Sequence, residues 1–557
     1  MSNGFWTRGA VCLVLLSLAC IAPPVQAECP GECKSDRKIS DLPGLGDGDF
    51  FGSAVAQLGD LDGNGVNELA VGAFWDEDGQ VNAGSVWILF FASDGTVDDT
   101  QKISNTEGNF PDPLAAGDWF GSSLAWLGDL GPGAPTPRAL AVGAMLHDDG
   151  ADASGAVWIL FLDSGGMVVH SEKISNTTVG FRGWLEAGDQ FGVSLSALGD
   201  LDGDGVSDLV VGAFGDDDGG PQHGAVWILF LDSNGTVKSH GKISDTEGGF
   251  EGQLRDNDHF GVSAASLGDV DGNDVVDLAV GAHADDDGDD LDPKERGAVW
   301  LLHLEVDTTG VGPVVTVKSH VKISDTEGCF EGELDDYDQL GISLAALGDL
   351  DGDGEGELAV GAVGDDDGGD GGGAIWILFL ERKGTACHHQ KISNLEGYAP
   401  PIDPGDGFGS SMSPLGDVDG DGVVDLAVGA WGDDDGGTDR GAVWLLFLHA
   451  RLSLDVMPES LRWGPPGGAV SYDIVRGDLG SLQSSAGDFI QATDECLEND
   501  HPGTSLPYTL SPNPEEGFWF LVRRVYSPLD RGTYDSCGPS EAAARDQEIA
   551  NSGVACP

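Results

Sequence analysis

The chain alternates short apolar runs with polar turns, and this pattern recurs six times. In the third copy the apolar runs cover residues 193–198, 209–213, 225–231 and roughly 237–243, each bounded by Gly, Asp or Asn. Short apolar runs between such turn residues predict β-strands. Each copy begins at a Phe-Gly step, with Leu340 in place of Phe in the fifth copy, and the glycines fall at positions 52, 121, 192, 261, 341 and 409. Four strands per copy at a regular spacing predict propeller blades or a solenoid.

The composition of the strands favours the propeller. Runs such as Ala-Val-Trp-Ile-Leu-Phe-Leu at 225–231 are apolar on both faces, so each sheet must lie between two neighbours. Radial stacking achieves this and protects the sheet edges. We therefore predict an all-β fold with a six-bladed β-propeller of four-stranded blades. One tryptophan per copy is expected to pack between blades, with an aromatic ligand cage as the alternative: Trp87, Trp158, Trp227, Trp300, Trp376 and Trp444.

The two ends of the repeat array predict how the ring closes. A Lys-Ile-Ser segment ends most copies, but the sixth copy runs out after Trp444 without one. The same segment, Lys38 to Ser40, precedes the first Phe-Gly step. We expect this N-terminal strand to close the last blade as its outer strand.

The flanking segments predict export and a second domain. Arg8 precedes an apolar run from Ala10 to Ala22, and Val25-Gln26-Ala27 offers a small-residue cleavage site. That run is too short to span a membrane. We expect a signal peptide at 1–27, a linker at 28–36, the propeller at 37–450 and a small β-sandwich at 451–557. The protein is then secreted, extracellular or at the cell surface, with the periplasm as an alternative and no membrane insertion.

The net charge limits the classes of binding partner, and the cysteines indicate disulfides. The net charge of −70, from 26 basic and 96 acidic residues, argues against nucleic acid and anionic membranes and suits divalent cations. Seven cysteines follow residue 27. In an exported chain they favour disulfides over metal thiolates. The preferred pairs are Cys29 with Cys33 and Cys496 with Cys556, and the odd count leaves at least one thiol free or intermolecular.

Five copies carry Asp-x-Asp followed by a third polar residue at position 5 and an acid at position 9 of a nonapeptide. Side-chain oxygens at positions 1, 3, 5 and 9, with the carbonyl of position 7, can converge on one cation. An all-oxygen, flexible ligand set favours calcium (Ca2+) over zinc, copper or magnesium. We therefore expect about five calcium sites. Their ligands would be Asp60, Asp62, Asn64, Val66 and Glu68; Asp200, Asp202, Asp204, Val206 and Asp208; Asp269, Asp271, Asn273, Val275 and Asp277; Asp349, Asp351, Asp353, Glu355 and Glu357; and Asp417, Asp419, Asp421, Val423 and Asp425.

Two departures sharpen this prediction. Asp274 occupies position 6 of its loop, where the other copies have the Gly that permits a left-handed turn, and Asp tolerates that conformation better than most residues. The second copy, residues 129–138, keeps only the first acid, Asp129, and ends in Arg138. It is expected to bind no metal.

The Phe-Gly, Asp-x-Asp-Gly-Asp-Gly and Val-Gly-Ala series resembles the FG-GAP repeat of integrin α-subunit N-terminal propellers over about residues 37–450. Secreted bacterial FG-GAP proteins are the more similar type. The resemblance implies calcium in the nonapeptide loops on the lower face, and ligands or partner subunits on the opposite face. The chain departs from the integrin pattern in having six copies where integrins have seven, and Val-Gly-Ala where the name motif has Gly-Ala-Pro.

The last hundred residues alternate apolar and polar positions, as in 469–476 and 517–523, and predict a separate sandwich. This segment resembles a fibronectin type III-like module. It contains Arg476-Gly477-Asp478, which we interpret as ordinary turn chemistry at a strand end rather than an adhesion motif.

No catalytic motif stands out from the repeat. His147, His223, His283, His388 and His389 are expected in loops as surface polar residues. We predict a non-catalytic, calcium-binding module for binding or adhesion, with a protein or glycan ligand on the face opposite the calcium loops, contacted by long loops such as 245–259. The alternative is a calcium-dependent carbohydrate-binding or carbohydrate-active propeller, lectin-like or lyase-like. The third interpretation is an exported structural protein without a specific ligand.

Overall fold

The computed structural model describes residues 33–448, apart from 94, 179, 288–293, 311, 351–353, 368, 383, 396–400 and 419–422, and seven strands between 454 and 531. The expected signal peptide and most of the expected linker lie outside the described residues. Every regular element of the described part is a β-strand. Within it, no helix has the length and apolar character needed to cross a membrane.

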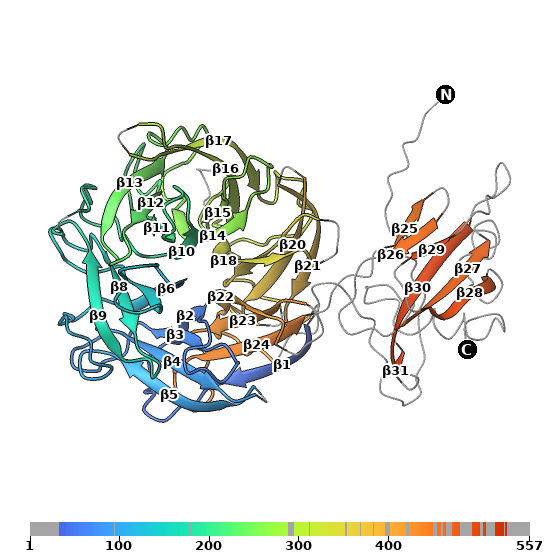
Figure 1. Ribbon diagram of the computed structural model, residues 1–557, viewed down its shortest axis with the longest axis horizontal. Helices are drawn as coiled ribbons and strands as arrows, with labels where there is room; N and C mark the ends of the chain where they lie inside the picture. The colour runs from blue at the N-terminus through green and yellow to red at the C-terminus, as the bar shows by residue number, and fades with distance from the viewer. Residues whose placement is uncertain are drawn as a thin grey trace.

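Six four-stranded antiparallel sheets are arranged around a ring (Figure 1). Each sheet is one blade, and the chain visits the blades in order. Blade 1 comprises β2 (Phe51–Gln57), β3 (Leu69–Ala73), β4 (Ser85–Phe91) and β5 (Val97–Ile103). Blade 2 comprises β6 (Phe120–Gly128), β7 (Ala139–Ala144), β8 (Ala156–Leu162) and β9 (Val168–Ile174). Blade 3 comprises β10 (Leu195–Gly199), β11 (Asp208–Ala213), β12 (Ala225–Leu231) and β13 (Val237–Ser244).

The other half of the ring repeats this order, so the predicted six-bladed propeller is confirmed. Blade 4 comprises β14 (Phe260–Gly268), β15 (Asp277–Ala282), β16 (Ala298–Asp307) and β17 (Val314–Ile323). Blade 5 comprises β18 (Leu340–Gly348), β19 (Glu357–Ala362), β20 (Ala374–Glu381) and β21 (Thr385–Ile392). Blade 6 comprises β22 (Phe408–Gly416), β23 (Asp425–Ala430), β24 (Ala442–Leu448) and the N-terminal β1 (Cys33–Ile39).

The N-terminal strand closes the ring as predicted. β1 pairs antiparallel with β24, so that Lys38 lies opposite Trp444 and Ile39 opposite Val443. The strand begins at Cys33, inside the segment expected as a linker. This boundary differs because β24 offers a free edge as far as Leu448, which lies opposite Cys33.

Each blade buries both faces against its neighbours. All positions of β3, β4, β7 and β8 are buried. Six apolar clusters fill the six interfaces, and each combines residues of two adjacent blades. The six repeat tryptophans are between 1% and 5% exposed, which places them in these clusters rather than in an open cage.

The two motif glycines of neighbouring blades meet backbone to backbone. In the blade 3 to blade 4 interface, a Cβ on Gly212 would lie 2.0 Å from the carbonyl oxygen of Gly261. Gly261 has a φ of +94°, and a Cβ there would lie 2.3 Å from the Ala225 carbonyl oxygen. The hydroxyl of Ser194 donates a hydrogen bond to the same Gly261 carbonyl, at 2.9 Å. The Phe-Gly and Val-Gly-Ala motifs are therefore the surfaces through which blades touch.

The Lys-Ile-Ser segment joins strand 4 to the acidic loop between strands 2 and 3. Lys242 Nζ lies 2.6 Å from Asp216 and 2.7 Å from Asp218, and 5.3 Å from the ring centre of Trp227. Ser244 Oγ donates to Asp218 at 2.9 Å. Burial alone would lower the pKa of Lys242, but the two carboxylates outweigh it and raise that pKa. The same ammonium–aspartate–indole contact recurs at Lys38, Lys102, Lys173, Lys322 and Lys391.

One disulfide was not anticipated, and the expected position of two histidines was wrong. Cys329 and Cys387 form a disulfide, a pair that the sequence did not suggest because its two cysteines lie 58 residues apart, on the loop before blade 5 and on β21. The partners expected for Cys33 and Cys496 lie outside the described residues. His388 and His389 were expected in a loop but lie in β21, because the repeat places them in strand 4, where His389 packs against Trp376.

The C-terminal strands form two separate sheets, drawn from orange to red in Figure 1. One contains β25 (Leu454–Met457), β26 (Ser460–Trp463) and β29 (Ser505–Pro507). The other contains β28 (Thr493–His501), β27 (Ser471–Asp478), β30 (Phe518–Ser527) and β31 (Asp530–Arg531). Their packing as a sandwich stays a prediction. The turn expected at Arg476-Gly477-Asp478 is wrong, because these residues belong to β27 and pair with β30.

Replacing Gly212 by Ala is expected to destabilise the propeller by about 1–3 kcal/mol, because the new methyl group overlaps the Gly261 carbonyl. The matched control is Gly241→Ala, where the nearest atom to a new Cβ lies 4.0 Å away. Denaturant unfolding of both variants measures the difference. Equal unfolding midpoints for the two variants would contradict the contact.

Titration of Asp189 should make stability depend on pH. Asp189 is 3% exposed, and its burial raises its pKa to about 7, from about 3.9 in an unfolded chain. The folded protein therefore holds the proton more tightly, and this contribution to stability is lost as the pH rises through about 7. We expect Asp189→Asn to lose less stability than the unaltered protein between pH 5 and pH 8, as thermal unfolding would measure. The exposed carboxylate of Asp152 provides the control, Asp152→Asn. An unchanged pH slope in Asp189→Asn would refute the argument.

Candidate metal centres

The five Asp-x-Asp loops, residues 60–68, 200–208, 269–277, 349–357 and 417–425, each join strand 1 to strand 2 of a blade. In an up-and-down sheet, these loops share one face of the ring with the loops between strands 3 and 4. The loops between strands 2 and 3, and those that lead from one blade to the next, lie on the opposite face. The propeller therefore separates the Asp-x-Asp loops from the acidic loops that pair with Lys242 and its equivalents.

Three of the loops bring their acids together. The carboxylates at positions 1, 3 and 9 each offer an oxygen, and these oxygens lie within 4.8 Å of one another. The three sets are Asp60, Asp62 and Glu68; Asp200, Asp202 and Asp208; and Asp269, Asp271 and Asp277. For the loops of blades 5 and 6, Asp351, Asp353, Asp419 and Asp421 lie outside the described residues.

The first acid of each loop shapes the turn. Asp200 accepts hydrogen bonds from the backbone N–H groups of Gly203 and Gly205, both at 2.7 Å. Asp269 does the same for Gly272 at 2.8 Å and for Asp274 at 2.7 Å. Asp274 has a φ of 65°, so it adopts the left-handed conformation expected at this position. The local turn thus places the carboxylates before any ion is considered.

The ninth acid anchors the loop to the blade. Glu68, Asp208, Asp277, Glu357 and Asp425 are at most 1% exposed and lie beside or at the start of strand 2. Asp208 accepts hydrogen bonds at 3.0 Å from the N–H groups of Leu201, in its loop, and Leu231, at the end of β12. The carboxylate thereby ties the loop to strand 3 of the same sheet.

These buried acids favour a positive charge nearby. Burial, together with the adjacent carboxylates of Asp62 and Asp202, raises the pKa of Glu68 and of Asp208 to about 7. Glu68 Oε1 is buried without a hydrogen-bond donor in the described part of the chain. A buried carboxylate oxygen without a partner is unfavourable, and a hard cation would satisfy it.

The fifth residue of each loop also makes hydrogen bonds that fix the shape of the loop. Asn64 and Asn273 donate their side-chain N–H groups to the carbonyls of Phe91 at 3.0 Å and Leu304 at 2.8 Å. Their Oδ1 atoms accept the N–H groups of Val66 and Val275, both at 2.7 Å. Asp204 likewise accepts from Val206 at 2.9 Å. The fifth residue therefore holds the loop in shape, and its role as a ligand, like that of the seventh carbonyl, stays a prediction.

Two lysines at the loops were not anticipated from the sequence. Lys238 Nζ lies 2.9 Å from Asp202 and also pairs with Asp204, and Lys318 Nζ lies 2.8 Å from Asp271. Both lie on strand 4, four residues before the lysine of Lys-Ile-Ser, and blade 1 has Asp98 at that position. This four-residue spacing is the feature of the sequence from which the two lysines could have been predicted. Blades 3 and 4 thus place an ammonium group beside their acids.

The second blade differs as expected from its residues. Asp129 accepts a hydrogen bond from Gly131 at 2.9 Å, and residues 129–138 contain no other acid. This described loop forms no set of converging carboxylates.

Comparison with known proteins supports the repeat assignment. The FG-GAP repeat model matches residues 191–229 and 408–446. Integrin alpha-PS2 of Drosophila melanogaster is 33% identical over 187 residues, which cover 32% of this chain and 12% of that protein. Integrin alpha-5 of Xenopus laevis is 31% identical over 244 residues, 42% of this chain and 20% of that protein. The chain therefore spans only a small part of the curated relatives it matches.

Among solved structures, BBS1N in complex with ARL6DN aligns with 76% of this chain and 98% of its own, at 12% identity and a TM-score of 0.35. Sqt1 from Chaetomium thermophilum aligns with 71% of this chain and 70% of its own, at 14% identity and a TM-score of 0.30. Neither similarity bears on function. The FG-GAP matches, the integrin alpha relatives and the six-bladed ring together support an FG-GAP propeller.

Proposed function

We propose that this propeller is a calcium-binding, non-catalytic module that binds a protein or glycan on the face opposite its Asp-x-Asp loops. The observation that carries the proposal is the convergence of three carboxylates in equivalent loops of blades 1, 3 and 4. Integrin alpha relatives with FG-GAP repeats are consistent with a binding module.

Calcium fits the loops better than other ions. The donors are carboxylates on a flexible turn, which suits the larger, less demanding coordination sphere of Ca2+. One oxygen of Glu68 is buried without a donor, and a net charge of −70 raises the local concentration of cations. The described parts of the loops of blades 5 and 6 keep the buried ninth acid, and we assign them to the same class, which makes about five sites.

The remaining parts of the proposal follow from charge and from the N-terminal sequence. A chain of this charge is a poor partner for nucleic acid or anionic membranes. We infer export from the sequence of residues 1–27, with a secreted or cell-surface location, and a fibronectin type III-like sandwich from the C-terminal strands. A calcium-dependent carbohydrate-binding or carbohydrate-active propeller is the second candidate, because an open pocket lies on the binding face.

Loss of one loop should remove one ion. Native mass spectrometry of the full chain in calcium is expected to count one ion fewer for Asp202→Ala than for the unaltered protein, because a carboxylate of the converging set is lost. Asp129→Ala, in the loop without converging acids, should leave the count unchanged. Identical counts in all three proteins would rule out the assignment.

Removing the competing ammonium group should strengthen one site. Lys238→Met is expected to tighten calcium binding at loop 200–208 by about fivefold, the scale of one partly exposed ion pair. Lys294→Met, on the opposite face, serves as the control. Calorimetric titration of chelator-treated protein measures both. Weaker binding by Lys238→Met would mean that the lysine supports the loop instead of competing with the ion.

A further inference from the structure

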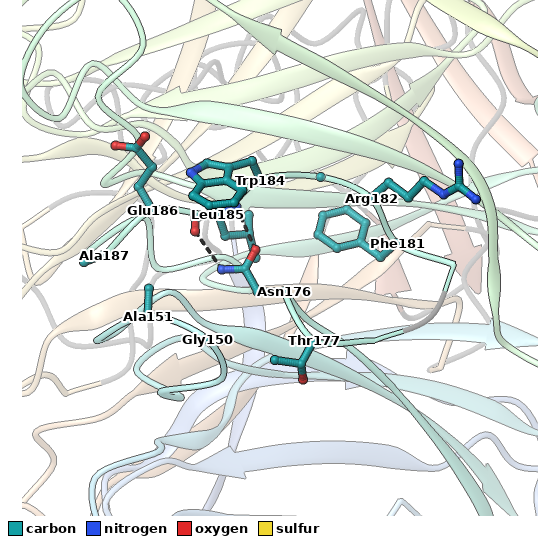
Figure 2. A pocket seen from close by; sticks show the side chains of 11 residues that line it. Gly150, Ala151, Asn176, Thr177, Phe181, Arg182, Trp184, Leu185, Glu186 and Ala187 are labelled. Atoms are coloured by element: carbon teal, nitrogen blue, oxygen red, sulfur yellow. Dashed lines mark hydrogen bonds between the residues drawn. The ribbon is translucent and has the colours of Figure 1, made fainter.

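A pocket of about 580 Å³ lies on the face opposite the Asp-x-Asp loops, where residues 175–190 lead from β9 to β10. Its lining includes Asn176, Phe181, Arg182, Trp184, Leu185 and Glu186. Figure 2 shows the indole of Trp184 over Leu185 and Asn176, with Arg182 and Glu186 on either side of it. The volume falls within the range of small-molecule sites.

The pocket is held by fixed contacts. Asn176 Nδ2 donates to the Leu185 carbonyl at 2.6 Å, and Leu185 N–H donates to Asn176 Oδ1 at 2.9 Å (Figure 2). Phe181 is buried and stacks on Phe191 with ring centres 5.3 Å apart. A Cβ on Gly183 would lie 2.3 Å from the Phe181 ring, so the chain lies tightly on the core there. Residues 182 and 184 are consequently presented from a preformed loop, which lowers the entropy cost of binding.

The same glycine-on-phenylalanine contact occurs in the loops before blades 4 and 5, but the neighbouring side chains differ. Gly252 and Gly332 pack on Phe250 and Phe330 as Gly183 packs on Phe181. Those glycines are flanked by Glu251 and Gln253, and by Glu331 and Glu333, whereas Gly183 is flanked by Arg182 and Trp184. The fold of the loop does not require an arginine and a tryptophan on either side of the glycine, because the other two loops have the same fold with acidic and amide residues there.

The exposed groups of the pocket suit one ligand class. Trp184 is 78% exposed, and its indole offers a flat apolar face with an N–H donor at its edge. Arg182 and Glu186 are exposed. The backbone N–H of Glu186 donates to Asp189 at 2.8 Å, which leaves the Glu186 carboxylate outside that contact. A pyranose ring presents an apolar C–H face to an indole, and hydroxyls at its rim that accept from a guanidinium and donate to a carboxylate. The net charge of −70 disfavours a polyanion.

We propose that the pocket formed by Arg182, Trp184 and Glu186 binds a neutral pyranose unit of a glycan. The proposal rests on the proposed function of this face as the ligand-binding face, and it names the ligand class. The sugar stacks on Trp184, Arg182 donates to its hydroxyl oxygens, and Glu186 accepts from its hydroxyl groups. Leu185 and Phe181 form the apolar base beneath.

The test is binding of the full chain, in calcium, to a printed array of neutral hexose oligosaccharides and uronate oligosaccharides. The unaltered protein is expected to bind neutral sugars, and Trp184→Ala to bind them at least about tenfold more weakly. Arg182→Ala should weaken binding by a smaller factor. Gln253→Ala, at the equivalent position of another loop, is the control and should bind as the unaltered protein does.

The same preparations are analysed by native mass spectrometry for bound calcium, which separates the two proposals. Absence of calcium would defeat the proposed function. Bound calcium with no sugar binding would overturn the glycan site and leave a protein segment as the occupant. Selective binding of uronates, or neutral-sugar binding that Trp184→Ala does not change, would also overturn it. Thermal unfolding of each variant confirms that the ring is intact.

Discussion

The whole molecule depends on a backbone contact between glycines of neighbouring blades. A Cβ on Gly429 would lie 1.9 Å from the carbonyl oxygen of Gly52, and the same approach recurs between Gly212 and Gly261. Because only hydrogen fits at these points, the inner strands of successive sheets can approach closely, and the large side chains of each sheet interlock further out. The contact between Gly52 and Gly429 joins the first blade to the last. Ring closure therefore uses the same surface as the internal interfaces.

Closure divides the loops between two faces with different chemistry. On one face, the Asp-x-Asp loops bring carboxylates together. In blades 3 and 4 a lysine lies beside these carboxylates, and among the described residues no such lysine accompanies those of blade 1. On the other face, an ammonium group such as Lys242 pairs with the aspartates of each acidic loop and packs on an indole. Lysine–aspartate pairs thereby stabilise the second face, whose longer loops differ in sequence from blade to blade.

The repeat made much of this predictable. Six copies of the same turn residues and apolar runs predicted the number of blades, the four strands in each and the closing role of Lys38 to Ser40. The prediction was reliable because each copy gave the same strand assignment independently of the others. The convergence of positions 1, 3 and 9 in the Asp-x-Asp loops was predictable because a local turn brings them together. The disulfide between Cys329 and Cys387 was not, since it joins a loop and a strand that only tertiary structure brings together. Lys238 was missed for the same reason: its contact with Asp202 depends on tertiary structure.

Hydrogen exchange of the full chain tests the closed ring most directly. The amide of Phe51 donates to the Arg440 carbonyl at 2.9 Å, and the amide of Phe260 donates to the His223 carbonyl at 3.0 Å. If the terminal blades meet through the same surface as the internal ones, peptides from β1, β2 and β24 should exchange as slowly as the corresponding peptides of β13, β14 and β12. Rapid exchange confined to β1, β2 and β24, with the internal blades protected, would contradict the account.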